Sequence, residues 1–198
     1  TTEIYTLSLH DALPIYYSYH IKEQDYTYDI TSYRKELKYK NNKPYKIEYA
    51  QTLKEDLKRR DFTINTLAID KDGKLIDVMH AKKDLDKKII KVVGDTETRL
   101  KEDKTRIIRA IRFACTLDFT LSKDIEKFLK KNGKYLNQIP KEYIKKELDK
   151  IFTSGNYIKF FDIVQKFKLN KYFLYSSFLI YSFGIWFRYL PSDRKSVV

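Results

Sequence analysis

Three arginines and one aspartate recur at steps of three near the middle of the chain; they are Asp103, Arg106, Arg109 and Arg112. On a helical wheel each such step rotates back by about 60°, so these side chains spread over one side of a helix. The apolar residues of the same stretch share the opposite arc; they are Ile107, Ile108, Ile111, Ala114 and Cys115. A carboxylate and three guanidiniums on one helix anchored by an apolar face suit the binding of a nucleotide. The alternative is that Asp103 and Arg106 form an ordinary i,i+3 pair on an exposed face.

The elements before this helix contain strands. Residues 17–33 alternate polar and apolar side chains around a polar turn at Lys22, which predicts a hairpin. Residues 35–50 are highly charged and predict a surface loop. Thr52 followed by Glu55 predicts a capping box that opens a helix running towards Leu67.

A second short hairpin is predicted around the Lys71-Asp-Gly turn, and after residue 93 the pattern becomes helical throughout. Ser122 is a predicted helix cap, Pro140 opens the next helix, and Gly155 with Asn156 ends it. Further helices are predicted near residues 157–167 and 171–190. The fold class is therefore α+β, with a strand-containing first part followed by helices.

The charge balance favours a polyanionic partner. The 198 residues include 40 Lys and Arg against 27 Asp and Glu, a formal net charge of +13. Such an excess favours nucleic acid over a membrane surface. The alternative is that the lysine-rich composition reflects an AT-rich genome.

Cysteine and hydropathy patterns favour a cytoplasmic protein with no membrane partner. Cys115 is the single cysteine and lies on the apolar arc, which predicts a buried free thiol and no internal disulfide. The most apolar stretch, residues 172–190, contains three serines and Arg188, which favours a buried helix over a membrane span. No signal peptide pattern is visible.

Both ends of the chain differ from the rest in character. Residues 1–15 and 192–198 resemble translated sequencing-adapter sequence and are excluded from the fold. The chain is then expected to be an internal piece of a longer protein.

Three motifs resemble one known family. Leu57 begins the run Leu-Lys-Arg-Arg-Asp-Phe-Thr-Ile-Asn, which resembles the R-R-D-F-T-x-N-A signature of bacterial-type, class II tRNA nucleotidyltransferases of the polymerase-β superfamily. This group includes CCA-adding enzymes and poly(A) polymerases. The hinge motif that follows is matched by Asp70, Gly73, Asp77, Asp84 and Leu85. Residues 102–113 are similar to the family's E-D-x-x-R-x-x-R-x-x-R-F nucleotide-recognition motif.

The resemblance implies the domain organisation. Residues 16–93 would be a partial nucleotidyltransferase head with a mixed β-sheet and helices. Residues 94–135 would be a helical neck, and residues 136–191 the start of a helical body that binds tRNA.

The resemblance also assigns roles to residues. Asp103 and Arg106 would pair with the base edge that C and A share, which has an exocyclic amine donor beside a ring nitrogen acceptor. U and G carry the donor and the acceptor in the reverse order. Arg109 and Arg112 would support this site and neutralise phosphate charge. Arg60 and Asp61 would contact the sugar and phosphates of the incoming nucleotide.

Neighbouring residues in the R-R-D segment have more than one interpretation. Asn65, four residues after Asp61, would share a helix face with it and orient it. Arg60 and Asp61 could instead be a structural salt bridge. Arg59 is expected to be solvated or close to the tRNA backbone.

Mg²⁺ is the cofactor that the resemblance implies. Family members bind it through an Asp-x-Asp pair after a G-G-x-x-R-D segment, upstream of the R-R-D motif. Neither is present in this sequence, so no metal ligands are assigned. The pairs Asp70/Asp72 and Asp84/Asp86 have the Asp-x-Asp spacing, but the first lies in a turn before Gly73 and the second follows the hinge motif, so both are rejected as metal ligands. Asp29 is either a third assisting carboxylate or an outward-facing polar strand residue.

The implied function is addition of C-C-A to tRNA 3′ ends from CTP and ATP. The body lysines that would contact tRNA phosphates, or be simply solvated, are Lys141, Lys145, Lys146, Lys159, Lys166 and Lys168. The alternatives are a poly(A) polymerase, an A-only or C-only enzyme, or a non-catalytic RNA-binding fragment. Without the Asp-x-Asp pair these 198 residues are expected to be inactive.

The hinge has Val78, His80 and Ala81 where P-F-G-G is common, which predicts a stiffer hinge.

Overall fold

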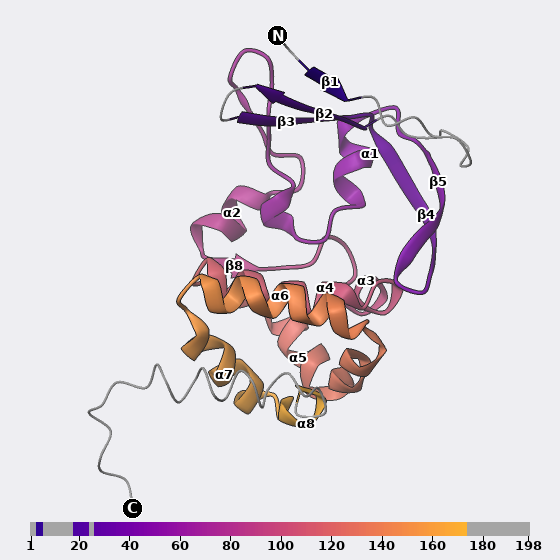
Figure 1. Cartoon of the computed structure of the whole chain (residues 1–198). Coiled ribbons are helices and arrows are strands. Elements are labelled where there is room, and N and C mark those ends of the chain that lie inside the picture. Colours follow the sequence, from indigo (N-terminus) through magenta and orange to yellow (C-terminus); the bar gives the residue numbers. More distant parts are fainter. Residues whose placement is uncertain (1–2, 6–17, 24–25, 174–198) are drawn as a thin grey trace, which may run out of the picture. The chain divides into compact units, whose positions relative to one another are not determined.

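The computed structural model describes residues 3–5, 18–23 and 26–173, with side chains from residue 31 onwards. The chain divides into two compact units, Thr1–Asp103 and Lys104–Val198. The first holds most of the strands and the second is mainly helical, so the predicted α+β class is confirmed (Figure 1). The division lies inside the predicted neck, and the predicted domain limits stay a prediction. No helix among the described residues combines the length and hydropathy needed to cross a membrane.

The first unit begins with a three-stranded antiparallel sheet in the order β1-β2-β3. The strands are β1 (Glu3–Tyr5), β2 (Ser18–Glu23) and β3 (Tyr26–Thr31). The pairing of β2 with β3 confirms the hairpin predicted for residues 17–33. Although residues 1–15 were excluded from the predicted fold, β1 pairs with β2 with Glu3 opposite Lys22.

A second hairpin joins β4 (Arg34–Lys40) to β5 (Lys43–Tyr49), so the prediction of a surface loop at residues 35–50 is wrong. Asn41 and Asn42 form the two-residue connection, with φ values of 51° and 63°. Asparagine tolerates this left-handed region, which tight hairpin turns require. The dense charge misled the prediction because a solvated two-stranded hairpin can leave many charged side chains in water while its strands pair through the backbone.

Helix α1 (Leu53–Lys58) begins at the predicted cap. The Thr52 hydroxyl accepts a hydrogen bond from the Glu55 N–H at 3.3 Å, and the Glu55 carboxylate accepts one from the Gln51 N–H at 2.8 Å. The helix ends at Lys58, so its predicted extension towards Leu67 is wrong.

The chain leaves the helical conformation after α1 because Phe62 is fully buried in an extended conformation. Phe62 forms a β-bridge with Val92. The Thr63 N–H donates to the Lys91 carbonyl at 2.9 Å, and the Val93 N–H donates to the Asp61 carbonyl at 3.1 Å. These backbone hydrogen bonds replace those of a continued helix. One 3₁₀ turn, η1 (Thr63–Asn65), follows.

The rest of the first unit contains short elements. They are β6 (Ala68–Ile69), β7 (Leu75–Ile76), α2 (Ala81–Asp86), β8 (Ile89–Ile90) and α3 (Thr96–Glu102). The pairing of β6 with β7 confirms the short hairpin. His80 precedes α2 with φ 56°, so a side chain occupies a left-handed position that favours glycine.

The predicted single helix through the nucleotide-recognition motif is wrong. α3 ends at Glu102 and a separate helix, α4 (Thr105–Thr116), begins after Lys104. Asp103 is extended, with φ −129° and ψ 100°. A carboxylate is unfavourable at the C-terminal end of one helix and favourable just before the N-terminus of the next, so Asp103 suits the break.

The second unit confirms most of the helix predictions. After α4 it contains β9 (Thr120–Leu121), α5 (Lys123–Asn132), η2 (Gly133–Gln138), α6 (Lys141–Thr153), α7 (Tyr157–Lys166) and α8 (Asn170–Phe173). The Ser122 hydroxyl caps α5, and Pro140 precedes α6 as predicted. Most of the helix predicted at residues 171–190 lies outside the described residues.

The apolar arc of α4 forms the core of the second unit. Ile107, Ile108 and Ile111 are essentially inaccessible to solvent, and α4 packs against α6 and α7. Cys115 is a buried free thiol, as predicted. Burial raises the pKa of its thiol to about 12, against a small lowering by the charge of Lys159, so it stays neutral and serves as core.

Candidate nucleotide and RNA site

Asp61 is held in a fixed orientation by its neighbours. Its Oδ1 accepts a hydrogen bond from Nδ2 of Asn65 at 2.9 Å and another from the Phe62 N–H at 2.9 Å. The predicted contact between Asn65 and Asp61 is therefore present, although η1 rather than a continuous α-helix creates it. Preorganised acceptors of this kind bind a ligand without first losing side-chain freedom.

Arg60 lies beside Asp61 with part of its guanidinium accessible. One terminal nitrogen donates to the Asn65 carbonyl at 2.9 Å, and the other lies 3.6 Å from Oδ2 of Asp56. The side chain is 41% exposed. Its buried Nε has no hydrogen-bond partner among the described residues. A guanidinium that is oriented by the protein yet still accessible suits contact with an anion.

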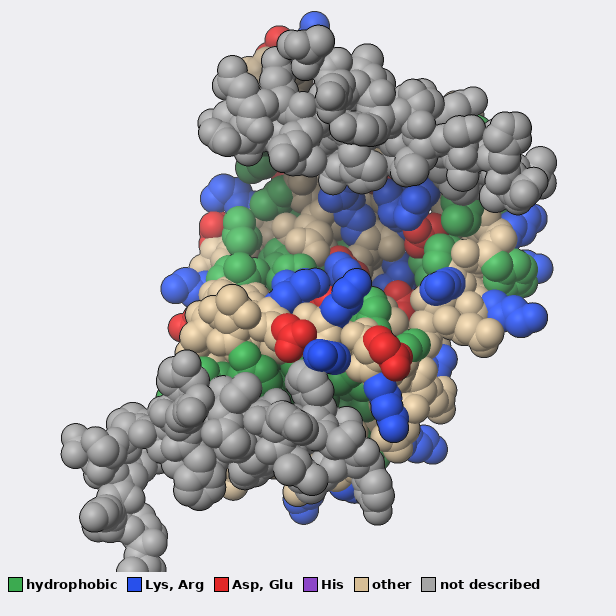
Figure 2. Space-filling model, viewed as in Figure 1, with side chains coloured by type: hydrophobic (Ala, Val, Ile, Leu, Met, Phe, Trp, Pro, Cys, Tyr) green, Lys and Arg blue, Asp and Glu red, His purple; other side chains and the backbone are tan. Residues whose placement is uncertain are grey.

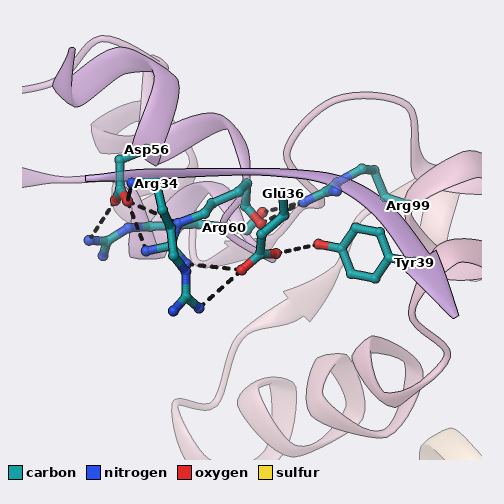
Figure 3. A network of polar contacts seen from close by, with 7 residues as sticks. Arg34, Glu36, Tyr39, Asp56, Arg60 and Arg99 are labelled. Atoms are coloured by element: carbon teal, nitrogen blue, oxygen red, sulfur yellow. Dashed lines mark hydrogen bonds and ion pairs between the residues drawn. The ribbon is translucent and has the colours of Figure 1, made fainter. Parts of the chain in front are cut away.

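Asp56 and Glu36 form the centre of a polar network that holds this segment against the β4–β5 hairpin (Figure 3). Asp56 is 3% exposed and accepts hydrogen bonds from the Arg34 N–H at 3.1 Å and from Nε of Arg59 at 2.9 Å. Glu36 pairs with Arg34 at 3.0 Å and accepts a hydrogen bond from the Tyr39 hydroxyl. The network links strand β4 to helix α1.

Arg59 belongs to this network, so its predicted solvated position is wrong. It pairs with Asp56 at 2.8 Å and with Glu36 at 3.4 Å, and its side chain is 19% exposed. Two largely buried carboxylates attract the guanidinium more strongly than water does. Arg59 therefore stabilises the segment from inside.

Arg99 on α3 was missed by the sequence analysis. Its NH2 donates to the carbonyl oxygens of Arg59 at 2.6 Å and Arg60 at 3.2 Å, and its NH1 pairs with Glu102 at 2.9 Å. These carbonyls follow the end of α1, where no intrahelical donor remains for them. The guanidinium therefore fixes the backbone that carries Arg60 and Asp61.

Asp103 and Arg106, the predicted base-reading pair, occupy different local environments. Asp103 is half-buried and caps the C-terminus of α3. Arg106 lies in the first turn of α4 and is 4% exposed. The break between the helices places them differently from the predicted i,i+3 spacing on one helix. Their base-reading role stays a prediction.

Arg109 and Arg112 follow on α4. Arg109 is half-buried, with its guanidinium 5.9 Å from the ring centre of Phe113. Arg112 donates from Nε to Oε2 of Glu147 on α6 at 2.5 Å, and its guanidinium lies 3.7 Å from the Phe113 ring centre. Arg112 thereby holds α4 against α6. The predicted phosphate-neutralising role of both arginines is untested.

Glu147 is the acidic centre of the second unit and is 3% exposed. Besides Arg112 it binds Nζ of Lys150 at 2.8 Å. Burial raises the pKa of this carboxyl. The hydrogen bonds and charges of Lys150 and Arg112 lower the pKa by more than burial raises it, so the pKa lies below its ordinary value. Glu147 is therefore a charged partner inside the helical core.

The predicted RNA-contacting lysines divide into two groups. On α6, Lys141, Lys145 and Lys146 are exposed. On α7, Lys159 pairs with Asp118 at 2.7 Å and Lys166 pairs with Glu126 at 2.6 Å. Lys168 is exposed just after α7. Lys141 and Lys146 are thus better placed to bind phosphate than Lys159 and Lys166.

The described residues do not fit the Mg²⁺ that the resemblance implies. In residues 31–173 no group of three or more His, Cys, Asp or Glu side chains is gathered around a common point. Asp70 accepts the N–H groups of Asp72 and Lys74, and Asp84 accepts the Thr63 hydroxyl at 2.8 Å. The rejection of the pairs Asp70/Asp72 and Asp84/Asp86 as metal ligands stays a prediction. Asp29 lies on β3 opposite His20, and its assisting role stays a prediction.

Two family models match the chain. The Poly A polymerase head domain matches residues 15–91. The model described as the probable RNA and SrmB-binding site of polymerase A matches residues 118–176. The first includes the R-R-D segment and the second includes helices α5, α6 and α7.

Curated relatives with similar sequences are CCA-adding enzymes. The enzyme of Streptococcus uberis is 40% identical over 138 residues, which cover 69% of this chain and 34% of the relative. The enzyme of Bacillus subtilis is 40% identical over 129 residues, 65% of this chain and 32% of the relative. The chain thus spans about a third of the length of these relatives.

Solved structures of the same kind share the fold. The Bacillus stearothermophilus CCA-adding enzyme in complex with CTP aligns with a TM-score of 0.69 and 29% identity over 78% of this chain and 37% of that one. A tRNA nucleotidyltransferase complexed with a primer tRNA and an incoming ATP analog aligns with a TM-score of 0.65 and 28% identity, over 86% of this chain and 46% of that one.

Proposed function

Because this chain belongs to the nucleotidyltransferase family of poly(A) polymerases and CCA-adding enzymes, we propose that the whole protein adds C, C and A to the 3′ ends of tRNA. CTP and ATP are its nucleotide substrates, and tRNA lacking its 3′ end is the acceptor. Relatives solved with CTP, and with a primer tRNA and an ATP analog, support this choice of substrates.

The observation that carries the proposal is the arrangement of Asp61. The carboxylate is oriented by Asn65 at 2.9 Å, beside the partly exposed Arg60. These three residues belong to the segment that resembles the family's R-R-D-F-T-x-N signature. Arg60 and Asp61 would bind the phosphates and ribose of the incoming nucleotide.

Base selection is assigned to Asp103 and Arg106. A carboxylate acceptor beside a guanidinium donor complements the amine donor and ring acceptor that cytosine and adenine share. A mismatched base would cost about 1–3 kcal/mol per bidentate contact. Arg109 and Arg112 would support this selection.

The reaction of the whole protein would use Mg²⁺, which supplies charge stabilisation for the departing pyrophosphate. Because the described residues do not fit this ion, the steps assigned to them are binding and base selection. The 198 residues by themselves are expected to add no nucleotide, and robust CTP addition by this chain would contradict that expectation. The cytoplasm is the proposed location, where free thiols such as Cys115 remain reduced.

The test is nucleotide addition by the whole protein. Purified enzyme is given tRNA that ends before C-C-A, with each of the four nucleoside triphosphates alone and in combination, and products are resolved at single-nucleotide length. Growth by three residues with CTP and ATP, and none with UTP or GTP, is expected. Long adenosine tails on varied RNAs would instead assign a poly(A) polymerase, and growth with only one nucleotide would assign an A-only or C-only enzyme.

A further inference from the structure

Two pairs of lysines face each other across the β4–β5 hairpin. Lys38 lies opposite Lys46, and Lys40 lies opposite Lys43. Residues directly opposite in an antiparallel pair project on the same face, where like charges repel. All four side chains are exposed. The hairpin therefore carries a repulsion that a bound polyanion would relieve.

Little within the hairpin neutralises these lysines. Among the residues whose side chains are described, Lys38, Lys40 and Lys43 make no ion pair. Lys46 lies 3.7 Å from Glu48, but both side chains are more than half exposed, so this pair contributes little.

Other side chains of β4 belong to the polar network with α1. Tyr39, which lies between Lys38 and Lys40 in the sequence, donates to Glu36 in the network with α1 (Figure 3). Lys38 and Lys40, on either side of Tyr39, are exposed instead. Figure 2 shows Lys and Arg side chains along the outer edge of the β4–β5 region.

Tyr45 adds an aromatic surface to this edge. A register shift leaves it between Pro44, paired with Tyr39, and Lys46, paired with Lys38. Its side chain is exposed, with 61% of the residue accessible. Exposed aromatic rings among cations are typical of proteins that bind single-stranded nucleic acid, because bases stack on the ring while lysines contact phosphates.

We propose that the β4–β5 hairpin binds single-stranded RNA, with phosphates on Lys38, Lys40, Lys43 and Lys46 and a base stacked on Tyr45. The identity of that RNA as the 3′ end of a tRNA rests on the proposed function. The binding surface itself rests on the charge pairing and exposure of the hairpin.

The experiment measures binding of this 198-residue chain to fluorescent tRNA that ends before C-C-A, by anisotropy over a series of salt concentrations. The test variant changes the four hairpin lysines to glutamine. The matched control changes four other exposed lysines of the first unit to glutamine and removes the same charge; these are Lys71, Lys74, Lys83 and Lys87.

The hairpin variant is expected to bind at least about tenfold more weakly, with the salt slope reduced by roughly 0.7 for each phosphate that is no longer bound. The control is expected to change affinity by less than about threefold. The melting temperature of the hairpin variant should stay the same or rise, since the repulsion is removed. If the four lysines acted only in folding, the melting temperature of the hairpin variant would fall instead.

Tyr45 gives an independent measurement. Tyr45→Ala should weaken binding by about fivefold or more, whereas Tyr45→Phe, which keeps the ring, should bind like the wild type. Equal losses in the hairpin variant and the control, or no loss in either, would overturn the proposal. So would an effect of the hairpin substitutions on anionic phosphatidylglycerol vesicles but not on tRNA.

The readout separates this inference from the proposed function. If the hairpin substitutions weaken RNA binding while the whole protein adds no C-C-A, the hairpin surface stands and the proposed function fails. If the whole protein adds C-C-A and the hairpin substitutions leave RNA binding unchanged, the proposed function stands and the hairpin surface fails.

Discussion

The guanidinium of Arg99 donates a hydrogen bond to the backbone carbonyl of Arg59 at 2.6 Å, across 40 positions of the sequence. The same nitrogen reaches the Arg60 carbonyl at 3.2 Å. Within the first unit, α3 thereby holds the backbone immediately before Asp61. The orientation of the proposed nucleotide-binding side chains thus depends on a residue to which no ligand contact is assigned.

Replacing Arg99 by alanine should weaken both folding and nucleotide binding. Hydrogen bonds from a charged donor contribute about 1.5–3 kcal/mol, so the free energy of unfolding should fall by about that amount. Affinity for CTP should fall as well, because Arg60 and Asp61 lose their fixed backbone. Urea unfolding and calorimetric titration with CTP measure the two effects.

Lys101→Ala is the control on the same helix, since Lys101 is exposed and its pair with Glu97 lies at the surface. It should cost less than about 1 kcal/mol. An Arg99→Ala chain with wild-type stability and CTP affinity would show that the guanidinium has no positioning role.

Asn65→Ala should reduce nucleotide affinity with little effect on stability. Without the amide, Oδ1 of Asp61 loses the hydrogen bond from Asn65, and the orientation of the carboxylate is less restricted. We expect CTP affinity to fall about tenfold and the free energy of unfolding to change by about 1 kcal/mol or less. Asn137→Ala, at an exposed position of the second unit, is the matched control. Equal CTP affinity in both variants would remove Asn65 from the site.

The contact between Asn65 and Asp61 was predicted from a spacing of four residues, yet a 3₁₀ turn creates it. The spacing predicted the contact itself, while the helical periodicity on which it rested is the wrong local structure. Phe62 decides the difference, because its burial and its bridge to Val92 draw the chain out of the helix. Such long-range pairing leaves no trace in a local pattern.

Helix caps and short turns were predictable because their determinants are local. Thr52, Ser122 and the Lys71-Asp-Gly turn each act within a few residues. Arg99 could not be found in this way, since its partners are backbone carbonyls distant in sequence. The role of Glu147 likewise depends on how α6 packs on α4.

The body lysines should differ in their contributions to RNA binding. Lys141→Gln with Lys146→Gln removes two exposed charges on α6, and should lower both tRNA affinity and the salt slope, by roughly 0.7–0.9 per phosphate contact. Lys159→Gln with Lys166→Gln removes charges already paired with Asp118 and Glu126, so the loss should be smaller. Anisotropy titrations of tRNA at several salt concentrations compare the two double variants. A larger loss in the α7 pair would contradict the assignment.

Glu147 should make the stability of the chain depend on pH in the acid range. Burial raises the pKa of its carboxyl, and Lys150 and Arg112 lower it by more, so the folded value lies below the ordinary value of 4.5. The unfolded chain therefore takes up the proton first as the pH falls. The stability that Glu147 contributes is fully present above pH 4.5 and is lost as the pH falls through the folded pKa.

Glu147→Gln should lower the free energy of unfolding by about 3 kcal/mol at pH 7, because Arg112 is left in the core without its charged partner. As the pH falls from 4.5 through the lower folded pKa, the difference between wild type and variant should shrink, since the unfolded wild-type chain and then the folded carboxyl take up the proton. Glu142→Gln, at an exposed position in the first turn of the same helix, should cost less than about 1 kcal/mol. Urea unfolding at several pH values between about 3 and 7, a range that includes the titration of carboxyl groups, measures these differences. A difference between wild type and Glu147→Gln that stays constant over this range would mean that packing, rather than the ion pair with Arg112, makes Glu147 stabilising.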